Sequence, residues 1–181
     1  TKESMELRER LLRERDNSRD GGVALSLAGV DTKEAMELRE RLLKEGNYAL
    51  PLAISLEGID TKEAMELRKR LIKKPGNGVE RAVGSLTGVD SKEAMELRKR
   101  LFKRVSKDVI AKSLRGTSTR EAMQLREKLL KEGVSKDIIA KGLIGVSTKE
   151  AMELRERFLK EGVDREYIAI LEKGYNEDAK N

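Results

Sequence analysis

Residues 31–43 read DTKEAMELRERLL, and close copies of this stretch recur along the chain. Six copies begin at Thr1, Thr32, Thr61, Ser91, Thr119 and Thr148. The hexapeptide EAMELR at 34–39 recurs unchanged at 63–68, 93–98 and 150–155. Such near-identity points to a recent internal duplication or to deliberate design. A repeat period of about 20–50 residues indicates a solenoid or a related array.

The copies divide the chain into repeats of similar length, because their first residues lie 28 to 31 positions apart. We place the repeats at 1–31, 32–60, 61–90, 91–118, 119–147 and 148–175, followed by a C-terminal tail at 176–181. A chain of 181 residues usually forms one domain or two. The repetition instead predicts a single array without independent halves.

Each repeat is predicted to begin with an amphipathic helix. An acidic or hydroxyl residue followed three positions later by Glu suggests a capping box, in which the cap side chain accepts from an early helix N–H. The pairs are Asp31 and Glu34, Asp60 and Glu63, Asp90 and Glu93, Ser118 and Glu121, and Ser147 and Glu150. Ala35, Leu38 and Leu42 have the i, i+3, i+7 spacing of a buried face. A glycine is expected to end the helix, at Gly46, Gly133 and Gly162.

A shorter second helix is predicted to follow. Its clearest copies are SKDIIAKGL at 135–143 and SKDVIAKSL at 106–114, each with Ser as the cap. Ile139 and Leu143 are expected to face inward. A small residue before the last Leu predicts close approach of two helices, at Ser26, Ser55, Ser85, Ser113 and Gly142. Glycine then ends the helix, at Gly29, Gly58, Gly88, Gly116 and Gly145.

The link from the second helix to the next repeat keeps its length, whereas the link within a repeat varies, as in PGNG at 75–78. This organisation is similar to the α-solenoid class of helical-hairpin repeats, of the tetratricopeptide and HEAT type. The resemblance implies an all-α solenoid of six repeats of about 30 residues, wound into a short curved superhelical rod. The tetratricopeptide pattern of Trp, Gly, Tyr, Ala and Pro is absent, so the resemblance implies no functional residues.

Composition excludes several classes of function. The chain has no Cys and no His, so thiolate chemistry and the usual nucleophile-and-base pairs are missing. We predict no catalytic residue, no cofactor and no metal site, and a protein that is not an enzyme. No run approaches the ~18 apolar residues of a membrane span, and no signal peptide is visible. We expect a cytoplasmic protein with no membrane partner. Because the chain starts at Thr1 rather than Met, we interpret it as a piece of a longer array.

Two cationic positions recur in each first helix. The first ladder is Arg8, Arg39, Arg68, Arg98, Arg126 and Arg155, and the second ladder, two residues on, is Arg10, Arg41, Arg70, Arg100, Lys128 and Arg157. One cation per repeat could track a phosphate backbone. However, Glu usually lies four residues before the second ladder, which is a favourable helix pairing, and the first ladder is within reach of acids in the adjacent repeat. We favour structural pairing for both ladders.

The net charge of +6 is unevenly distributed, with +11 in the three central repeats and −5 in the outer three. The central excess forms a candidate basic binding patch for nucleic acid or an acidic protein, and the alternative is drift on a solvated surface. The patch residues are Arg68, Lys69, Arg70, Lys73, Lys74, Arg98, Lys99, Arg100, Lys103, Arg104, Lys107, Lys112 and Arg115. Aromatic residues make up only 3% of the chain, so few are available to stack on bases.

One position varies while its neighbours are nearly fixed, just before the glycine of the second helix. Its occupants are Ala28, Glu57, Thr87, Arg115 and Ile144. One varied exposed site per repeat is how modular arrays specify a ligand. An unconstrained surface position has the same appearance, and we favour that interpretation.

The sequence therefore predicts a non-enzymatic helical-repeat scaffold that presents an extended surface to a protein or peptide partner. One alternative is a nucleic-acid-binding array that uses the basic central repeats, residues 61–118. Another is a structural or designed module with no specific ligand. In that case copies of the chain would associate end to end through its last apolar stretch, at Tyr167, Ile168, Ile170 and Leu171.

Overall fold

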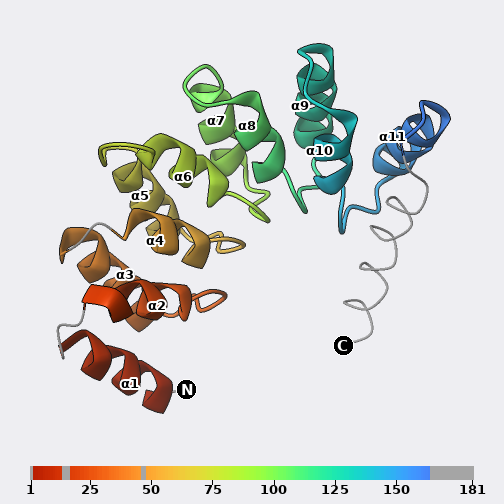
Figure 1. The fold of residues 1–181 in the computed structure, drawn as a ribbon. Coiled ribbons are helices and arrows are strands. Elements are labelled where there is room, and N and C mark those ends of the chain that lie inside the picture. The colour runs from red at the N-terminus through yellow and green to blue at the C-terminus, as the bar shows by residue number, and fades with distance from the viewer. Residues whose placement is uncertain (1, 14–16, 46–47, 164–181) are drawn as a thin grey trace. The chain divides into compact units, whose positions relative to one another are not determined.

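A computed structural model of the chain describes residues 2–13, 17–45 and 48–163 (Figure 1). All regular secondary structure in these ranges is α-helical, which confirms the predicted all-α class. The chain divides into two compact units, Thr1–Leu86 and Thr87–Asn181. The boundary falls in the turn that follows the third repeat's short helix, so the first unit contains the helices of the first three repeats. A single array of six repeats stays a prediction.

Long and short helices alternate in each unit. The first unit contains α1 (Lys2–Arg13), α2 (Asn17–Leu25), α3 (Lys33–Glu45), α4 (Ala49–Ser55), α5 (Lys62–Leu71) and α6 (Gly78–Gly84). The described part of the second unit contains α7 (Lys92–Leu101), α8 (Lys107–Ser113), α9 (Arg120–Lys131), α10 (Lys136–Lys141) and α11 (Lys149–Lys160). The long helices are the predicted first helices of the repeats, and the short ones are the second.

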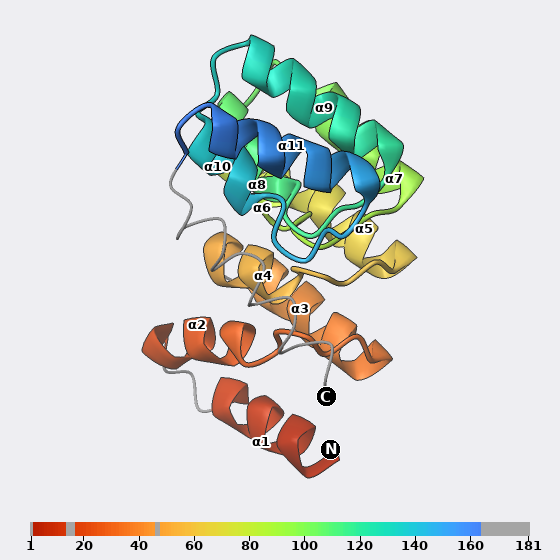
Figure 2. The ribbon, with the colours of Figure 1, turned by 90° about the vertical axis from the view of Figure 1, so that its right-hand side faces the viewer.

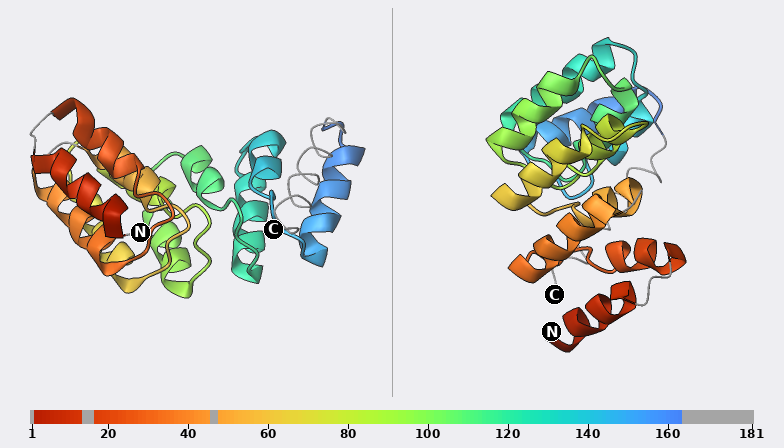
Figure 3. Two further views of the ribbon diagram at one scale, coloured as in Figure 1. Left: turned by 90° about the horizontal axis from the view of Figure 1, so that it is seen from below. Right: turned by 90° about the vertical axis from the view of Figure 1, so that its left-hand side faces the viewer.

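Helices of the same kind pack side by side within the first unit. The short helix α4 contacts both α2 and α6, and the long helix α3 contacts both α1 and α5 (Figure 2). Buried apolar side chains of these repeats form one cluster. In the second unit α10 contacts α8, α9 and α11 (Figure 3). Within a unit, each repeat therefore buries its apolar face against the next one.

The long helices begin one residue later than the capping-box prediction placed them. Hydroxyl side chains accept from the N–H of the alanine three positions on, as Thr61 does from Ala64. The other caps of this kind are Ser91, Thr119 and Thr148. The predicted boxes were therefore wrong, and Asp60 and Asp90 precede the caps. Thr or Ser, rather than the preceding Asp, is therefore the cap. The N–H that it satisfies, at the third helical position, belongs to alanine rather than to glutamate.

Several other local predictions are confirmed. Ser106 and Ser135 cap α8 and α10. The short helices are followed by glycines with φ between 72° and 74°, the left-handed region that side chains disfavour, at Gly29, Gly58, Gly88, Gly116 and Gly145. Gly133 and Gly162 end long helices with φ of 89° and 88°, and Gly46 lies outside the described residues. The predicted inward residues are buried: Ala35, Leu38, Leu42, Ile139 and Leu143. None of the described helices is both long and apolar enough to cross a membrane.

Candidate functional site

The first-ladder arginines lie inside the protein. The buried members are Arg39, Arg68, Arg98, Arg126 and Arg155, and the first four have no exposed surface. Arg8, in the first repeat, is half-buried. Arginine is rarely buried unless its donors are satisfied, so the partners of these guanidinium groups define what the ladder does.

Arg39 shows the common set of contacts. Its Nη2 donates to the carbonyl oxygens of Leu27 at 2.6 Å and Ser55 at 2.8 Å, and its Nη1 to that of Val30 at 2.8 Å. Leu27 and Val30 lie in the turn that ends the preceding repeat, whereas Ser55 ends α4 of the arginine's own repeat. One guanidinium thus joins segments of two successive repeats.

Carbonyl groups at the same offsets recur along the chain. Oxygens twelve and nine residues before the arginine accept from Arg68, Arg126 and Arg155. The planar guanidinium suits this role because it presents several donors in a fixed geometry. The arginines of the first ladder therefore bind the backbone of the protein itself.

The arginines stay charged at neutral pH despite their burial. Desolvation lowers the pKa of the Arg39, Arg68 and Arg126 guanidinium groups to about 10. Nearby acids oppose the shift, since Asp60 raises the pKa of Arg68 and Asp90 that of Arg126. The protonated form keeps every N–H available as a donor at pH 7.

The burial corrects two sequence-based predictions. Arg68 and Arg98 were assigned to the basic patch, but neither reaches the surface, so they do not belong to a surface site. The first ladder was also expected to pair with acids of the adjacent repeat, whereas in the structure these arginines donate mainly to carbonyl groups, as Arg39 does. The pattern of charged residues shows which side chains could pair, but it does not show backbone acceptors. The recurring small residue in the second helix was the sequence feature that could have indicated these contacts.

That small residue is the acceptor for the arginine Nε. The hydroxyl of Ser85 accepts from Arg68 Nε at 3.1 Å and donates to the carbonyl of Ala82 at 2.8 Å. Equivalent pairs join Arg39 to Ser55 and Arg98 to Ser113. The prediction of a close helix approach holds at Gly142, where an added Cβ would lie 3.4 Å from the Ala111 oxygen of α8.

Gly142 supplies no hydroxyl, and its arginine shows the consequence. The Nε of Arg126 is buried and has no hydrogen-bond partner among the described residues. The guanidinium still donates to the Gly142 carbonyl oxygen at 2.8 Å. The carbonyl contacts therefore hold the arginine in place without the serine.

Two members of the second ladder pair with acids of the preceding repeat, whereas Arg41 and Lys128 pair with Glu45 and Glu132 of their own repeats. Arg70 Nη1 lies 3.4 Å from Glu40 Oε1, and Arg157 Nη1 lies 3.1 Å from Glu127 Oε1. The acid expected to pair with Arg70, Glu66, instead contacts Lys69 at 2.8 Å. The predicted pairing four residues apart was therefore wrong at this site, where Arg70 joins α5 to α3, as Arg157 joins α11 to α9.

The remaining members of the basic patch divide between the two units. Lys69 and Lys99 form ion pairs with acids three residues earlier in their own helices, and Lys107 pairs with Glu132. In the first unit Lys73 is exposed and Lys74 partly so. The other exposed patch cations are on the second unit: Arg100, Lys103, Arg104, Lys112 and Arg115.

The varied positions lie in the tight turns after the short helices. Ala28, Glu57 and Arg115 are exposed, and Thr87 and Ile144 are partly so. Arg115 contributes its backbone, because its carbonyl oxygen accepts from the N–H of Gly88 at 3.0 Å. Their exposure agrees with a surface position and does not distinguish a ligand-specifying site from an unconstrained one.

An exposed group of aliphatic side chains occupies the short helices of the first unit. Leu25, Leu50 and Ile54 are 43%, 52% and 39% exposed. Leu50 and Ile54 are four residues apart on α4 and so share a face. Leu25 holds the position of Ile54 one repeat earlier, and α2 packs against α4. We call these three residues the aliphatic face.

Sequence reasoning missed the aliphatic face, although aligned repeats contain the signal. The position of Leu25 and Ile54 is occupied by Lys112 and Lys141 in the second unit. The position of Leu50 is occupied there by Asp108 and Asp137. An apolar residue where its equivalents are charged indicates an exposed site, because the fold does not need an apolar side chain there.

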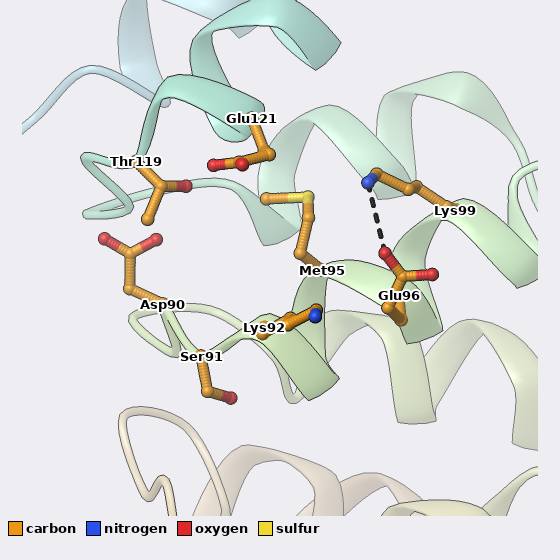
Figure 4. Close-up of a pocket in the computed structure, with 8 residues that line it drawn as sticks. All are labelled: Asp90, Ser91, Lys92, Met95, Glu96, Lys99, Thr119 and Glu121. Atoms are coloured by element: carbon orange, nitrogen blue, oxygen red, sulfur yellow. Dashed lines mark hydrogen bonds and ion pairs between the residues drawn. The ribbon is translucent and has the colours of Figure 1, made fainter.

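A groove of about 310 Å³ lies between α7 and the start of α9 (Figure 4). Asp90 and Thr119 face each other at one end, Met95 lies at its centre, and the Lys99–Glu96 ion pair lies at the other end. Asp90 Oδ2 accepts from the backbone N–H and the hydroxyl of Ser118 at 2.8 and 3.0 Å. A groove of about 560 Å³ occupies the equivalent place between α1 and α3. Its recurrence indicates a product of repeat stacking rather than a specialised centre.

The described residues offer no arrangement for metal binding, since they contain no group of three or more His, Cys, Asp and Glu side chains suited to hold an ion. Tyr167, Ile168, Ile170 and Leu171, the predicted self-association residues, lie outside the described residues. In comparisons with known proteins, the chain matches no family model, no curated protein and no solved structure.

Proposed function

We propose that the chain is a non-enzymatic helical-repeat scaffold that binds a protein or peptide. We further propose that its six repeats continue as one α-solenoid, because the same carbonyl offsets recur around buried arginines in both units. Solenoids bind partners through extended surfaces formed by successive repeats.

The aliphatic face is the observation that carries this proposal. Exposed apolar side chains that lie together on adjacent helices are typical of protein interaction sites. Leu25, Leu50 and Ile54 are not needed for the fold, since lysine and aspartate occupy their positions in other repeats. A partner that covers these side chains removes their apolar area from water, which favours binding.

Other repeats of the chain supply substitutions that should leave the fold unchanged. Leu50→Asp and Ile54→Lys install the residues found at the same positions of α8 and α10, so the variant is expected to fold. Peptides selected from a random display library against the immobilised wild-type chain would then be titrated against both proteins by calorimetry. We expect apolar-anchored peptides whose affinity falls at least about tenfold in the double variant.

The matched control is Lys112→Ala, on α8 of the second unit. It should leave peptide affinity unchanged, because the proposed site is confined to α2 and α4. Selection of no peptides, or equal binding to the double variant, would remove the aliphatic face as the binding surface.

Nucleic-acid binding stays a second candidate because exposed cations gather in and just after α7. Arg100, Lys103 and Arg104 are all exposed. Fluorescence anisotropy with single- and double-stranded nucleic acids would test it at low and physiological salt. Phosphate binding through these residues predicts a steep salt dependence that Lys103→Glu reduces, whereas no binding at low salt would exclude it.

A further inference from the structure

The link between α5 and α6 ends in Asn77, which is followed directly by Gly78. In an Asn-Gly pair the side-chain amide is readily attacked by the next peptide nitrogen, because glycine has no Cβ to obstruct the close approach. Asn17, Asn47 and Asn176 are followed instead by serine, tyrosine and glutamate. Asn77 therefore has a reactivity that these other asparagines lack.

Packing requires the glycine at position 78. Gly78 is buried at the start of α6. An added Cβ there would clash with the carbonyl oxygen of Leu71 and would lie 3.3 Å from the Cβ of Lys74. The Leu71 oxygen belongs to the backbone of α5, so it cannot move aside as the end of a flexible side chain could. The fold thus maintains the residue that makes the neighbouring asparagine reactive.

The side chain of Asn77 is accessible and is not used as a helix cap. It is exposed and makes no capping hydrogen bond with α6. At the same place in α8 and α10, Ser106 and Ser135 accept from a helix N–H. The N–H of Gly78 lies in the first turn of α6, where backbone donors have no acceptor within the helix. The helix therefore holds neither of the two reacting groups.

The contact that resists the reaction is a single bond at a helix end. The N–H of Arg81 donates to the carbonyl oxygen of Asn77 at 2.9 Å. Ring closure turns the peptide group between Asn77 and Gly78 toward the asparagine side chain, and this movement breaks the bond. Helix ends fray readily, and α6 has only seven residues, so opening of its first turn requires little disruption.

We propose that Asn77 is a site of spontaneous deamidation. The nitrogen of Gly78 attacks Cγ of Asn77, a C–N bond forms, and the side-chain nitrogen leaves as ammonia with the proton of the attacked peptide group. Water opens the resulting cyclic imide at one of its two carbonyl groups, which leaves aspartate or isoaspartate. The reaction consumes only water. It does not involve the aliphatic face and is independent of the proposed function.

The two products should affect α6 differently. Aspartate leaves the main chain unchanged and places a carboxylate at the start of the helix, where negative charge is favourable. Isoaspartate instead carries the main chain through the former side chain, which inserts a methylene before Gly78 and displaces the carbonyl that accepts from Arg81. Because Ser85 at the end of α6 accepts from Arg68, a displaced α6 should also disturb this buried contact.

Incubation of the full chain at mildly alkaline pH and physiological temperature tests the site. Peptide-mass mapping of timed samples shows where a side-chain NH2 has been replaced by OH, and an ammonia assay measures the release. We expect Asn77 to be lost while Asn17, Asn47 and Asn176 persist, with ammonia released in step with that loss. In the control variant Asn77→Gln the side chain would have to close a larger ring, so most of the release should disappear.

Unfolding in urea tests the structural consequence after the two products have been separated by chromatography. Asn77→Asp supplies the aspartate form directly and should unfold at about the wild-type urea midpoint. The isoaspartyl form should unfold at a lower urea concentration and lose amide protection first in α6.

Persistence of Asn77 through the incubation would overturn the proposal. So would equally fast conversion of Asn47, because the reaction would then not depend on the following glycine. An isoaspartyl form as stable as Asn77→Asp would contradict the predicted displacement of α6.

Discussion

Replacing Arg68 by methionine tests the role of the buried arginines most directly. Methionine keeps an apolar stem of similar volume but removes the charge and all five N–H donors. The Nη2 of Arg68 donates to the carbonyl oxygens of Leu56 at 2.6 Å, Ile59 at 3.0 Å and Ser85 at 2.9 Å. The substitution withdraws a donor from all three.

The expected loss of stability follows from which acceptors keep a partner. The Leu56 oxygen still accepts from the N–H of Ile59 at 3.2 Å. The oxygens of Ile59 and Ser85 lose the donor that Arg68 supplies, and two buried unsatisfied acceptors cost about 2–6 kcal/mol together. Removing the buried charge offsets about 3 kcal/mol at most, given the lowering of the Arg68 pKa to about 10. We expect Arg68→Met to lower the free energy of unfolding by about 2 kcal/mol.

Urea denaturation followed by far-ultraviolet circular dichroism measures the loss, and amide hydrogen exchange locates it. Protection should fall most in α5, α6 and the turn at 56–59, the segments joined by the guanidinium. Arg70→Met, two residues along the same helix, is the control, because its exposed ion pair is worth about 0–1 kcal/mol. Arg68→Lys keeps the charge but loses the planar donor set, and should also destabilise. Equal losses for Arg68→Met and Arg70→Met would refute the assignment.

Three further predictions follow from the contacts and burial of individual side chains. Ser85→Ala should lower the unfolding free energy by about 1 kcal/mol, because an arginine Nε loses its acceptor; an unchanged urea midpoint would contradict this. Leu38→Ala should cost about 2–5 kcal/mol and Leu7→Ala well under half of that in dilute solution, because only the first is buried; similar losses would mean that burial does not separate them. The hydrogen bond from Lys136 is the main cause of the lowered pKa of Glu161, so Lys136→Met should return that pKa toward 4.5 in a carboxyl ¹³C NMR titration. With Lys136 present, the carboxylate's contribution to stability is complete above pH 4.5 and declines as the pH falls through the lowered pKa.

The sequence was sufficient for the features that depend on periodicity and on glycine. Leu38, Leu42 and Ile139 are buried as their spacing predicts, and Gly133 adopts the positive φ expected at a helix end. The basic patch was less predictable, because charge counting cannot tell a solvated cation from Arg68, whose partners are backbone carbonyls. Folding brings those carbonyl groups from two turns together around the guanidinium, and the sequence alone does not show this arrangement.

The exposure of the aliphatic face and of Leu7 required the structure for a different reason. Leu50 and Leu7 are leucines like those of the core, and sequence periodicity does not distinguish an exposed leucine from a buried one. Their exposure depends on which helices lie beside them, and that is a property of the stack rather than of one repeat.

The arginine contacts also explain why one link of the repeat has a fixed length and the other varies. The acceptor carbonyls of the preceding repeat lie twelve and nine residues before Arg39, Arg68, Arg126 and Arg155 alike. An insertion in the turn between repeats would move these carbonyls out of reach, leaving a buried charge without its acceptors.

The acceptor in the arginine's own repeat imposes no such limit on sequence spacing. The Ser or Gly that follows the variable link lies 15 to 18 residues after its arginine, from Arg98 to Ser113 at one extreme and Arg8 to Ser26 at the other. The described links at 72–77, 102–106 and 132–135 differ in length, yet the carbonyl group at the end of each short helix keeps its contact with the arginine. Insertions are therefore tolerated where no guanidinium contact spans them. Arg39, Arg68, Arg126 and Arg155 each bind carbonyl groups of the repeat before them, so the nearest-neighbour stability within each unit has a polar component beside the apolar one.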